Sequence, residues 1–413
     1  MLYFILRPLT RFALKAYFRR ITINGLENLP LDSPVLLCSN HPTGFIEPCL
    51  LACFLPRTLH FLVRGDLFEK PVLSKILIST NQIPIYRFRD GYGKLRNNRK
   101  VMNISYEKLA EGKAILIFPE ASTTEVKHLR PVKKGAARMA LETLELQSDK
   151  NLTIVPIGIN YSGPNRWRSY VNINIGDPIH PEVVEDQKEM PRAIKDLTVT
   201  IEKKLSDLLL VLNDNVAQES LNTVLDLGQW DIPVKTGLRV KHNEPEKFIQ
   251  ERDLSLKLNE DVDFDGVEEA RPDLHKFDPK PVSFGELLFG ALIFIPVCLF
   301  LLLNALPVII GIKIRNKYVR ENEFIASIAI AASLGAYMIL FTLIFIILLF
   351  VVGWWAFLMF LLPYLGLIGL KGRDYLKNIQ YRLKLKSKLG QSKMSKIYDN
   401  GIRIVQKIQQ NSL

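Results

Sequence analysis

Cysteine and histidine are scarce in this sequence: its 413 residues contain four of the first and six of the second. The cysteines, Cys38, Cys49, Cys53 and Cys298, show no paired metal-ligand spacing and have no nearby histidine that would complete a zinc set. This pattern argues against a metal site. It predicts free thiols in a reducing compartment.

The N-terminal segment lacks the basic start and the small-residue cleavage site of a signal peptide, and its charges interrupt it too often for a membrane span. Arg7, Arg11 and Lys15 recur every four residues, so a helix would present them as one basic stripe on an apolar surface. We expect residues 1–20 to form an amphipathic helix in the membrane interface. Packing of this helix on the folded domain is the alternative.

Residues 21–211 alternate between apolar, strand-like runs and helix-like stretches. The alternation predicts a layered α/β domain, a mixed sheet flanked by helices. The strand-like runs read PVLLCS, TLHFLV, IPIY, AILIF, TIVPIGI and YVNINIG. Residues 212–281 have few apolar runs and become acidic, so we expect a partly helical connector there.

Two apolar blocks follow the connector. Residues 284–312 are apolar apart from Glu286 and Asn304, and residues 324–370 contain no charge over 47 positions. A membrane span needs about 20 residues. The second block is therefore long enough for two spans, with a turn near VVGWW. We expect an integral membrane protein.

Basic residues flank both apolar blocks, and basic loops near membrane ends prefer the cytoplasmic side. This favours a re-entrant or kinked hairpin for residues 284–312 and a two-span hairpin for 324–370, with three simple spans as the alternative. The α/β domain is expected on the cytoplasmic face, together with a basic tail formed by residues 371–413.

The net charge of +12 is concentrated in that tail, which contains eleven lysines or arginines and two aspartates. A basic tail after an apolar block favours anionic membrane lipids as partners, each basic residue contributing about 1 kcal/mol. No nucleic-acid recognition module accompanies the tail, so we expect no nucleic-acid partner.

The stretch SNHPTGFIEP places His41 in a turn after an apolar strand, with Glu47 six positions later and Pro48 next. The carboxyl end of a strand in an α/β layer is well placed for a site. Pro48 suits the first turn of a helix, where a carboxylate is also favoured. If the turn brings Glu47 to the imidazole, the pair is a competent general base. The residues alone leave open a capping glutamate beside an unrelated surface histidine.

Further polar residues follow other strands. Arg87 comes just after IPIY and has the planar fork that suits phosphate. Glu120 and Ser122 follow AILIF and suggest an acceptor-binding wall, although a capped loop has the same pattern. Lys133 and Lys134 open a helix-like stretch and would attract an anion there. An ordinary solvent-exposed helix end would show the same sequence pattern.

Together these motifs resemble the phospholipid/glycerol acyltransferase family. Its first motif, Asn-His followed by an acid, is matched by Asn40, His41 and Glu47. IPIYR, FPEAS and IVPIGINY match the second, third and fourth motifs in order, and the resemblance covers roughly residues 20–210. The long spacing after His41 is more similar to the glycerol-3-phosphate or dihydroxyacetone-phosphate branch than to the usual lysophosphatidate branch.

The resemblance implies a role for each matching residue. His41 would take the proton from an acceptor hydroxyl as it attacks an acyl thioester, and Glu47 would orient His41. Arg87 would hold the acceptor phosphate, and Glu120 would help to position glycerol hydroxyls. Further candidates for acceptor binding are Asn40, Arg64, Ser122, Lys133 and Lys134. The donor would be acyl-CoA or acyl-carrier protein, with no metal or bound cofactor.

Two residues depart from the family pattern: Glu47 stands in place of Asp, and Ala121 in place of a glycine that can adopt a left-handed backbone. These departures are compatible with an altered acceptor or with lost activity. Two other functions therefore stay open. One is acylation of another lipid, such as an amino-acid lipid, which would not need Arg87. The other is a non-catalytic lipid-binding scaffold, in which His41 would have no chemical role.

Overall fold

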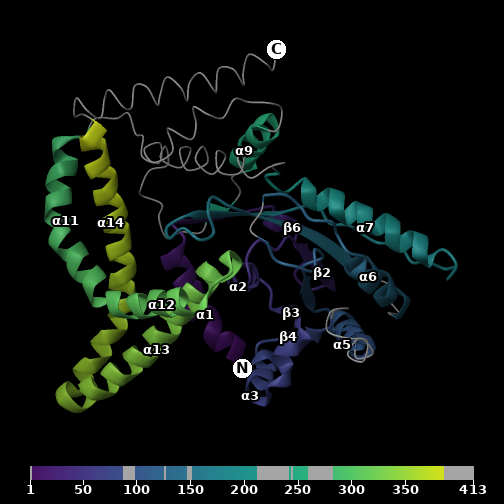
Figure 1. The fold of residues 1–413 in the computed structure, drawn as a ribbon, viewed down its shortest axis with the longest axis horizontal. Helices are drawn as coiled ribbons and strands as arrows, with labels where there is room; N and C mark the ends of the chain where they lie inside the picture. Colours follow the sequence, from purple (N-terminus) through teal and green to yellow (C-terminus); the bar gives the residue numbers. More distant parts are fainter. Residues whose placement is uncertain are drawn as a thin grey trace.

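The computed structural model describes residues 2–86, 98–124, 127–146, 151–211, 241–242, 245–258 and 282–385. An α/β domain lies beside a group of long helices, which we call the helical region and which comprises residues 282–385 (Figure 1).

An eight-stranded sheet forms the middle of the described α/β domain, in the order β4-β3-β5-β2-β6-β7-β1-β8. The pairs are parallel except for β6 and β7, which confirms the predicted mixed sheet. The six predicted strand runs correspond to β2 through β7. The strands are β1 (Arg20–Asn24), β2 (Val35–Ser39), β3 (Leu59–Arg64), β4 (Gln82–Ile85), β5 (Ala114–Ile117), β6 (Thr153–Tyr161), β7 (Tyr170–Ile175) and β8 (Lys241–His242).

Helices cover both faces of this sheet. On one face lie α1 (Leu2–Tyr17) and α2 (Ile46–Phe54), and on the other lie α5 (Asn98–Ala110), α6 (Gly135–Leu146) and α7 (Met190–Ser206). Among the described residues of this domain, the remaining elements are α3 (Pro71–Ser79), α9 (Pro245–Leu258) and two short 3-10 helices, η1 (Leu26–Asn28) and η2 (Gly65–Glu69).

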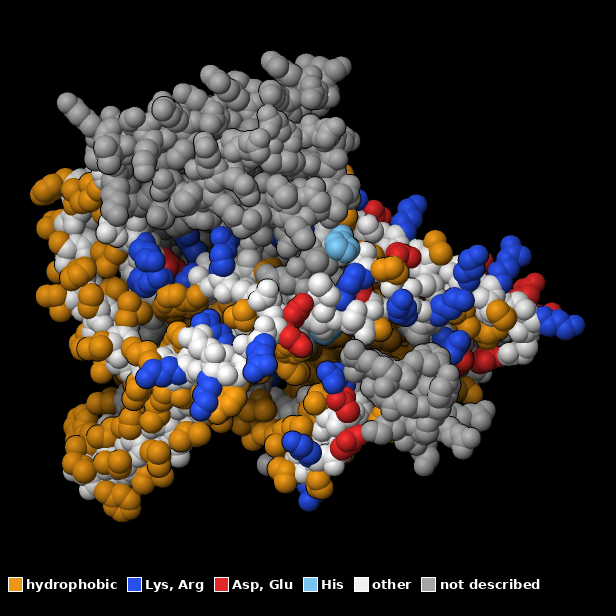
Figure 2. All heavy atoms as spheres, viewed as in Figure 1, with side chains coloured by type: hydrophobic (Ala, Val, Ile, Leu, Met, Phe, Trp, Pro, Cys, Tyr) orange, Lys and Arg blue, Asp and Glu red, His pale blue; other side chains and the backbone are white. Residues whose placement is uncertain are grey.

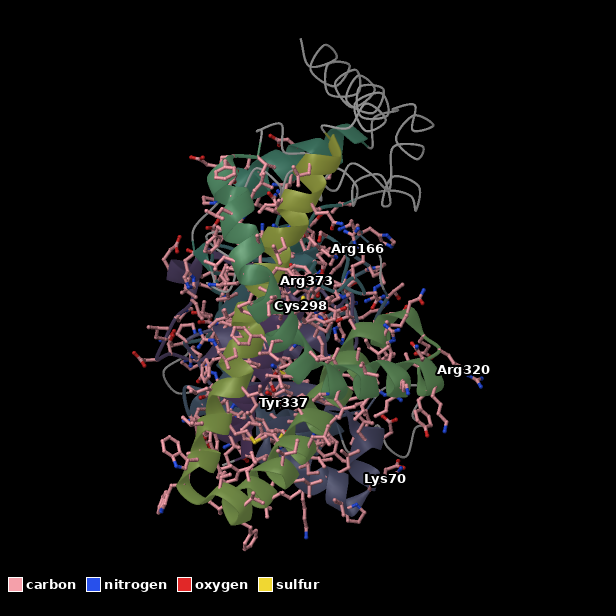
Figure 3. The ribbon with its side chains drawn as sticks, turned by 90° about the vertical axis from the view of Figure 1, so that its left-hand side faces the viewer. Lys70, Arg166, Cys298, Arg320, Tyr337 and Arg373 are labelled. Atoms are coloured by element: carbon pink, nitrogen blue, oxygen red, sulfur yellow. The ribbon has the colours of Figure 1, made fainter. Side chains whose placement is uncertain are left out.

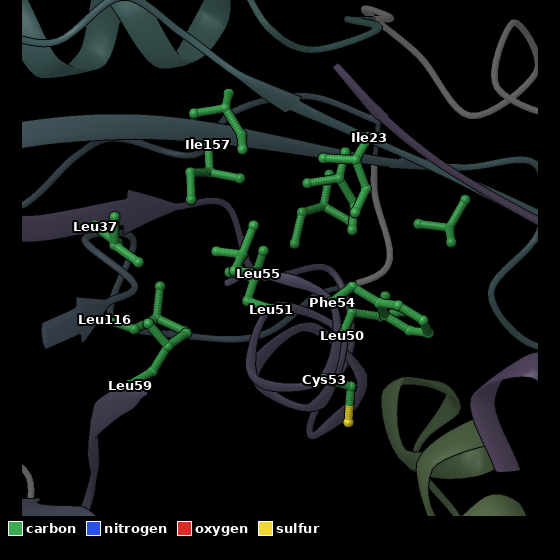
Figure 4. Packing of buried hydrophobic residues seen from close by; sticks show 14 of the residues in the cluster. Ile23, Leu37, Leu50, Leu51, Cys53, Phe54, Leu55, Leu59, Leu116 and Ile157 are labelled. Atoms are coloured by element: carbon green, nitrogen blue, oxygen red, sulfur yellow. The ribbon is translucent and has the colours of Figure 1, made fainter. Parts of the chain in front are cut away.

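The sheet separates two hydrophobic cores. Successive side chains of a strand point to opposite faces, so Leu37 of β2 joins the core under α2 whereas Leu36 and Cys38 join the other one. Figure 4 shows the first core, in which Leu50 and Leu51 of α2 pack beneath the strands. This packing fixes α2, and with it the first turn of α2, against the central strand.

Elements of two predicted segments join neighbouring parts of the structure. The segment predicted as a connector contributes β8 to the sheet edge, where Lys241 pairs with Thr22 of β1, and it also forms α9. The predicted tail begins as helix, because α14 continues to Leu385. Residues 386–413 lie outside the described part of the chain.

Helix α1 packs on the domain through the buried Tyr3 and Leu14, and two residues of its basic stripe contact the end of α2. Arg7 donates to the carbonyl oxygen of Leu55 at 2.7 Å, and the Arg11 guanidinium lies 5.3 Å from the centre of the Phe54 ring. The predicted basic stripe therefore contacts the end of α2. Phe4 and Ile5 are 62% and 50% exposed, so an apolar side of α1 faces outward.

The helical region consists of α11 (Phe284–Leu303), α12 (Ala305–Tyr318), η6 (Asn322–Phe324), α13 (Ile325–Val352), η7 (Gly353–Leu361) and α14 (Leu362–Leu385). Helix α11 packs along α14, and α12 packs along α13 (Figure 1). The first apolar block is therefore kinked, and each half packs mainly on a different helix of the second block. The second block turns at Gly353, which has a φ of 59°, where the sequence predicts a turn.

The two polar residues of the first apolar block, Glu286 and Asn304, form hydrogen bonds within the helical region. Glu286 closes a capping box with Ser283 at the start of α11. Asn304 lies at the kink, where its Nδ2 donates to Phe300 at 2.9 Å and its Oδ1 accepts from Tyr337 of α13 at 2.9 Å. Figure 3 labels Tyr337 on α13. Polar side chains that pair across apolar helices hold such helices together.

Two segments of the described chain, Phe284–Leu303 and Asn322–Gln380, are long and apolar enough to cross a membrane. Their surfaces expose large apolar side chains, and Ile295 and Phe350 are 75% and 86% exposed. Figure 2 shows these hydrophobic side chains spread along the left side of the molecule. Because extended apolar surface marks membrane or protein contacts, the helical region indicates membrane association.

A buried ion pair joins the helical region to the α/β domain. Arg168, just before β7, donates to Asp374 of α14 at 2.6 Å, and the two side chains are only 6% and 11% exposed. Beside them, the Arg373 guanidinium lies 4.3 Å from the centre of a Trp167 ring. These contacts fix α14 against the loop that precedes β7.

Candidate active site

The candidate active site lies where neighbouring parallel strands end. In the sheet β2 lies between β5 and β6 and is parallel to both. Their carboxyl ends therefore meet at one edge. His41 comes two residues after β2, Glu120 comes three residues after β5, and Tyr161 is the last residue of β6. The sheet order thus brings together side chains from three distant parts of the sequence.

His41 and Glu47 form the pair that the motif spacing suggests. The Nδ1 atom of His41 lies 2.9 Å from Oε2 of Glu47, so the longer glutamate side chain reaches the imidazole. The Glu47 side chain has no exposed area, whereas that of His41 is 15% exposed. An ionised carboxylate only accepts hydrogen bonds, so Nδ1 carries the hydrogen and Nε2 is left to accept a proton.

Glu47 also accepts hydrogen bonds from other groups at its second oxygen. Oε1 accepts from the hydroxyl of Thr43 at 2.7 Å, from the backbone N–H of Thr43 at 3.2 Å and from the hydroxyl of Tyr161 at 2.8 Å. A buried carboxylate is costly unless it is hydrogen-bonded. These donors compensate for its burial and hold it in one orientation towards His41.

Tyr161 was not singled out by the sequence analysis, although it ends the quoted motif IVPIGINY. Burial, and secondly the charge of Glu47 beside it, raises the pKa of Tyr161 well above its usual value. The phenol therefore stays protonated at neutral pH and continues to donate to Glu47.

The His41 ring stacks on Phe118 of the motif FPEAS. The ring centres are 4.0 Å apart and the planes differ by 13°. Phe118 directly follows β5, so the third motif forms one wall against which the imidazole lies flat. With Glu47 fixing one ring nitrogen, this stacking determines how the imidazole is oriented.

Asn40 connects the ends of two strands. Its Nδ2 donates to the carbonyl oxygen of Ile159 at 2.9 Å, and its Oδ1 accepts from the N–H of Ile159 at 2.8 Å. The side chain is buried, and both ends of its amide are paired with β6. In this structure the Asn40 side chain joins the His41 turn to β6, and its predicted contact with substrate stays a prediction.

Glu120 is likewise engaged by the protein. Its Oε1 accepts from the backbone N–H of His41 at 2.8 Å, and its Oε2 accepts from Nε of Arg130 at 2.7 Å. The Glu120 side chain is only 3% exposed. The carboxylate thus holds the main chain of the His41 turn, and its predicted contact with glycerol hydroxyls stays a prediction.

Arg130 is a site residue that sequence reasoning missed. Its guanidinium donates to the side chains of Ser122 at 2.6 Å and Thr124 at 3.0 Å, and to the carbonyl oxygen of His41 at 3.4 Å. Ser122, predicted to bind the acceptor, is thus a partner of Arg130. The only available signal was the position of Arg130 in the basic stretch LRPVKKG.

Ala121 adopts the left-handed backbone that its family counterpart, glycine, adopts readily. Its φ is +58°, and its N–H donates to the carbonyl oxygen of Phe118 at 3.1 Å. The conformation that the substitution put in doubt is therefore present. For a residue with a Cβ it costs about 1–2 kcal/mol.

The predicted phosphate ligands lie in different settings. Arg64 is exposed at the end of β3 and donates to both oxygens of Asp66, at 3.1 and 2.7 Å. Lys133 and Lys134 are exposed just before α6, and the N–H of Lys133 donates to the carbonyl oxygen of Pro119 at 2.8 Å, beside Glu120. Arg87 lies outside the described residues, so its contact with phosphate stays a prediction.

The cysteines are free, as predicted. Burial raises the pKa of the Cys38 and Cys53 thiols to about 12, so neither is a nucleophile at neutral pH. Within the described part of the chain, no three His, Cys, Asp or Glu side chains are grouped so that they could hold a metal ion.

Comparison with known proteins agrees with the motifs. Residues 20–160 match the family model described as Acyltransferase, a segment that runs from β1 into β6 and contains both His41 and Glu47. This part of the chain is thus similar to an acyltransferase domain, and several relatives that it matches are named as glycerol-3-phosphate or 1-acyl-sn-glycerol-3-phosphate acyltransferases.

Glycerol-3-phosphate O-acyltransferase 1 of Saccharomyces cerevisiae is 36% identical over 114 residues, which cover 26% of this chain and 15% of the yeast protein. The chain thus matches only a small part of that relative's length. The 1-acyl-sn-glycerol-3-phosphate acyltransferase of Bacillus subtilis is 26% identical over 166 residues, which cover 39% of this chain and 74% of the bacterial one. A solved structure of the 1-acyl-sn-glycerophosphate acyltransferase PlsC from Thermotoga maritima aligns with a TM-score of 0.36 and 18% identity, over 50% of this chain and 80% of that one.

Proposed function

We propose that this protein is a membrane-bound O-acyltransferase. It transfers a fatty acyl group from an acyl thioester to a hydroxyl of a glycerol-phosphate-type acceptor, glycerol-3-phosphate or lysophosphatidate, in phospholipid synthesis. The observation that carries this proposal is the hydrogen bond between Nδ1 of His41 and the fully buried Glu47, at the carboxyl end of the central strand β2.

In the proposed reaction Nε2 of His41 removes the proton from the acceptor hydroxyl while the hydroxyl oxygen attacks the thioester carbonyl carbon. Glu47 stabilises the imidazolium that forms. The tetrahedral intermediate then collapses, the carbon–sulfur bond breaks, and the thiol leaves with the proton returned from His41. The products are the acyl ester and the free thiol of the donor, and no metal or bound cofactor takes part.

Acyl-CoA or acyl-carrier protein is the proposed donor, and both carry a negatively charged phosphopantetheine arm. Arg87 is the proposed ligand of the acceptor phosphate because arginine binds phosphate through two parallel N–H groups. The exposed Lys133 and Lys134 next to the third motif support an anionic substrate at this end of the sheet.

We place the α/β domain on the cytoplasmic face of the membrane. Lys313, Lys317 and Arg320 are exposed at the end of α12 and just beyond it, where Figure 3 shows Arg320. The N–H groups of the His41 turn contact η6 and α13, which follow directly. Basic residues beside apolar segments prefer the cytoplasmic side, which supports placing the site there, next to the bilayer.

The test is acyl transfer in membranes that contain the full chain, with a radiolabelled acyl thioester and a panel of acceptors. His41→Ala should abolish product formation, whereas His180→Ala, at an exposed histidine outside the described site, should leave it unchanged. Equal product from wild type and His41→Ala would instead favour the lipid-binding scaffold.

The same assay separates the acceptor classes. Arg87→Ala should raise KM for a phosphate-bearing acceptor strongly. If an amino-acid lipid is acylated with undiminished efficiency by Arg87→Ala, the acceptor assignment is wrong while the catalytic assignment stands.

A further inference from the structure

The turn that carries His41 contacts the start of α13, far away in the sequence. The backbone N–H of Gly44 donates to the carbonyl oxygen of Glu323 at 3.0 Å. The backbone N–H of Phe45 donates to the hydroxyl of Ser327 at 3.2 Å, across 282 positions of the chain. Two backbone donors of the proposed active-site turn are therefore satisfied by the helical region.

These donors lie at the N-terminus of α2, whose first turn holds Glu47. The first N–H groups of a helix have no partner within the helix and need one from elsewhere. Phe45 occupies the N-cap position, and no side chain of α2 caps it. Ser327 supplies from α13 an acceptor for the N–H of Phe45, the bond that the side chain at the third helical position makes in a capping box and that Pro48, at this position, cannot make.

Phe324 fits against a glycine of the same turn. A Cβ built on Gly44 would lie 2.2 Å from a ring carbon of Phe324, far inside contact distance. The Phe324 ring also lies 5.9 Å from the ring of Phe45, centre to centre. The absence of a side chain at residue 44 therefore lets the Phe324 ring lie directly on the turn.

The start of α13 is itself fixed to the α/β domain. Asn165 donates to the carbonyl oxygen of Asn322 at 3.0 Å and accepts from the N–H of Ala326 at 3.2 Å. Ala326 and Ser327 are 1% and 4% exposed, and Ala326 packs in the same core as α2. The contact with the turn is thus part of a buried interface.

We infer that Phe324 and Ser327, at the start of the long apolar helix α13, are positioning residues of the active site. They hold the turn between His41 and Glu47 and so keep the imidazole at the distance that proton transfer requires. A misplacement of about 1 Å at a catalytic group can lower a rate by about 100-fold. The inference rests on the proposed function, and it makes catalysis depend on how α13 packs against the domain.

The first experiment measures kcat and KM for full-length Ser327→Ala and Ser327→Thr in membranes, with protein amounts determined in parallel. Ser327→Ala should lower kcat about 10-fold or more with little change in KM, because geometry is lost and substrate contacts are not. Ser327→Thr retains the hydroxyl and should recover most of this loss. Ser333→Ala, six residues farther along α13, is the matched control and should behave as wild type.

The second experiment is a double-mutant cycle that uses the steric fit. Gly44→Ala should lower kcat strongly, because the added methyl group must displace either the Phe324 ring or the turn. Phe324→Ala alone should have a smaller effect, and the double variant Gly44→Ala/Phe324→Ala should regain activity relative to Gly44→Ala. Because removing the ring can only relieve Gly44→Ala if the two residues meet, this recovery does not depend on overall stability.

The outcomes separate the two proposals. No acyl transfer by the wild type with any acceptor would remove the proposed function. An active wild type with unchanged kcat in Ser327→Ala, or strictly additive effects of Gly44→Ala and Phe324→Ala, would overturn the positioning role alone.

Discussion

The hydroxyl of Tyr161, the last residue of β6, donates to Oε1 of Glu47 in the first turn of α2 at a distance of 2.8 Å. The other oxygen of the same carboxylate faces Nδ1 of His41. A strand end on one side of β2 therefore determines where the acid of the pair points. The proposed base depends on three elements of the fold, β2, α2 and β6, and each can be tested by substitution.

Tyr161→Phe removes this donor and leaves the packing of the ring in place. We expect kcat to fall about 10-fold, because Glu47 keeps its contacts with Thr43 but loses one that fixes its orientation. The rate should be measured at saturating donor and acceptor. Tyr318→Phe, at an exposed tyrosine at the end of α12, is the control, and an equal loss there would contradict this explanation.

The raised pKa of Tyr161 makes a prediction about alkaline pH. The phenol of an unfolded chain titrates near pH 10, and burial of Tyr161 beside Glu47 raises its pKa in the folded protein. Its contribution to stability is complete below about pH 10 and is lost as the pH rises further, because the unfolded chain then releases the proton first. Thermal unfolding in detergent between pH 8 and pH 11 should show a smaller alkaline loss in Tyr161→Phe than in wild type.

Substitutions of Glu47 test whether both the charge and the length of this side chain are needed for activity. Glu47→Gln keeps the shape but removes the charge that stabilises the imidazolium, so activity should fall about 100-fold or more. Glu47→Asp keeps the charge but withdraws it by one methylene from His41, and we expect an intermediate loss. Full activity in Glu47→Asp would mean that α2 moves to restore the contact. Full activity in Glu47→Gln would show that the carboxylate has no catalytic role.

The main elements of the site could be predicted because local patterns mark them. An apolar run followed by polar residues identifies a strand end, and parallel strands gather their carboxyl ends at one edge of a sheet. His41 and Glu120 follow this rule, and Glu47 is identified by its spacing after His41 and by Pro48 at a helix start. The sheet and its layers could be predicted for the same reason, since alternation of strands and helices is a property of short windows of sequence.

The partners of those residues could not be predicted, because they depend on the order of strands and on packing between distant segments. Tyr161 and Glu47 are 114 positions apart, and Ser327 and Phe45 are 282 apart. Arg130 lies in a loop, and a loop sequence has no hydrophobic periodicity that would distinguish an ion-pair partner of Glu120 from a solvent-exposed charge. The hydrogen bonds of Asn40 with β6 and of Glu120 with the His41 turn could not be predicted, because their partners are backbone groups that carry no side-chain signal in the sequence.

Ala121 supplies a prediction about stability. A glycine there would relieve the left-handed strain of about 1–2 kcal/mol but would add about 0.5–1 kcal/mol of backbone entropy to the unfolded chain. Ala121→Gly should therefore stabilise the domain by about 0.5–1 kcal/mol, with activity retained. Ala140→Gly, inside α6, should instead destabilise it by about 1 kcal/mol. A lower thermal midpoint for Ala121→Gly than for wild type would show that the methyl group has a packing role.

The pair Arg168–Asp374 predicts how firmly the helical region is held. Both side chains are nearly buried, and Arg168 also donates to the carbonyl oxygens of Lys15, Ala16 and Phe18 at the end of α1 and just beyond it. Removing one partner of a buried pair leaves the other charge uncompensated, at a cost of about 3–5 kcal/mol. Asp374→Asn should therefore lower the thermal midpoint in detergent and expose the loop before β7 to protease.

The exposed pair Arg192–Asp196 on α7 provides the control, because its side chains are 84% and 67% exposed. Solvent screens such a pair almost completely, so Asp196→Asn should leave both the midpoint and the protease pattern as in wild type. If Asp374→Asn also lowers kcat while Asp196→Asn does not, docking of α14 and the geometry of the His41 turn are linked through the same interface. If Asp374→Asn is as stable as wild type, the pair is replaceable and the other contacts of the helical region, such as those of η6 and α13 with the His41 turn and with Asn165, hold it to the domain.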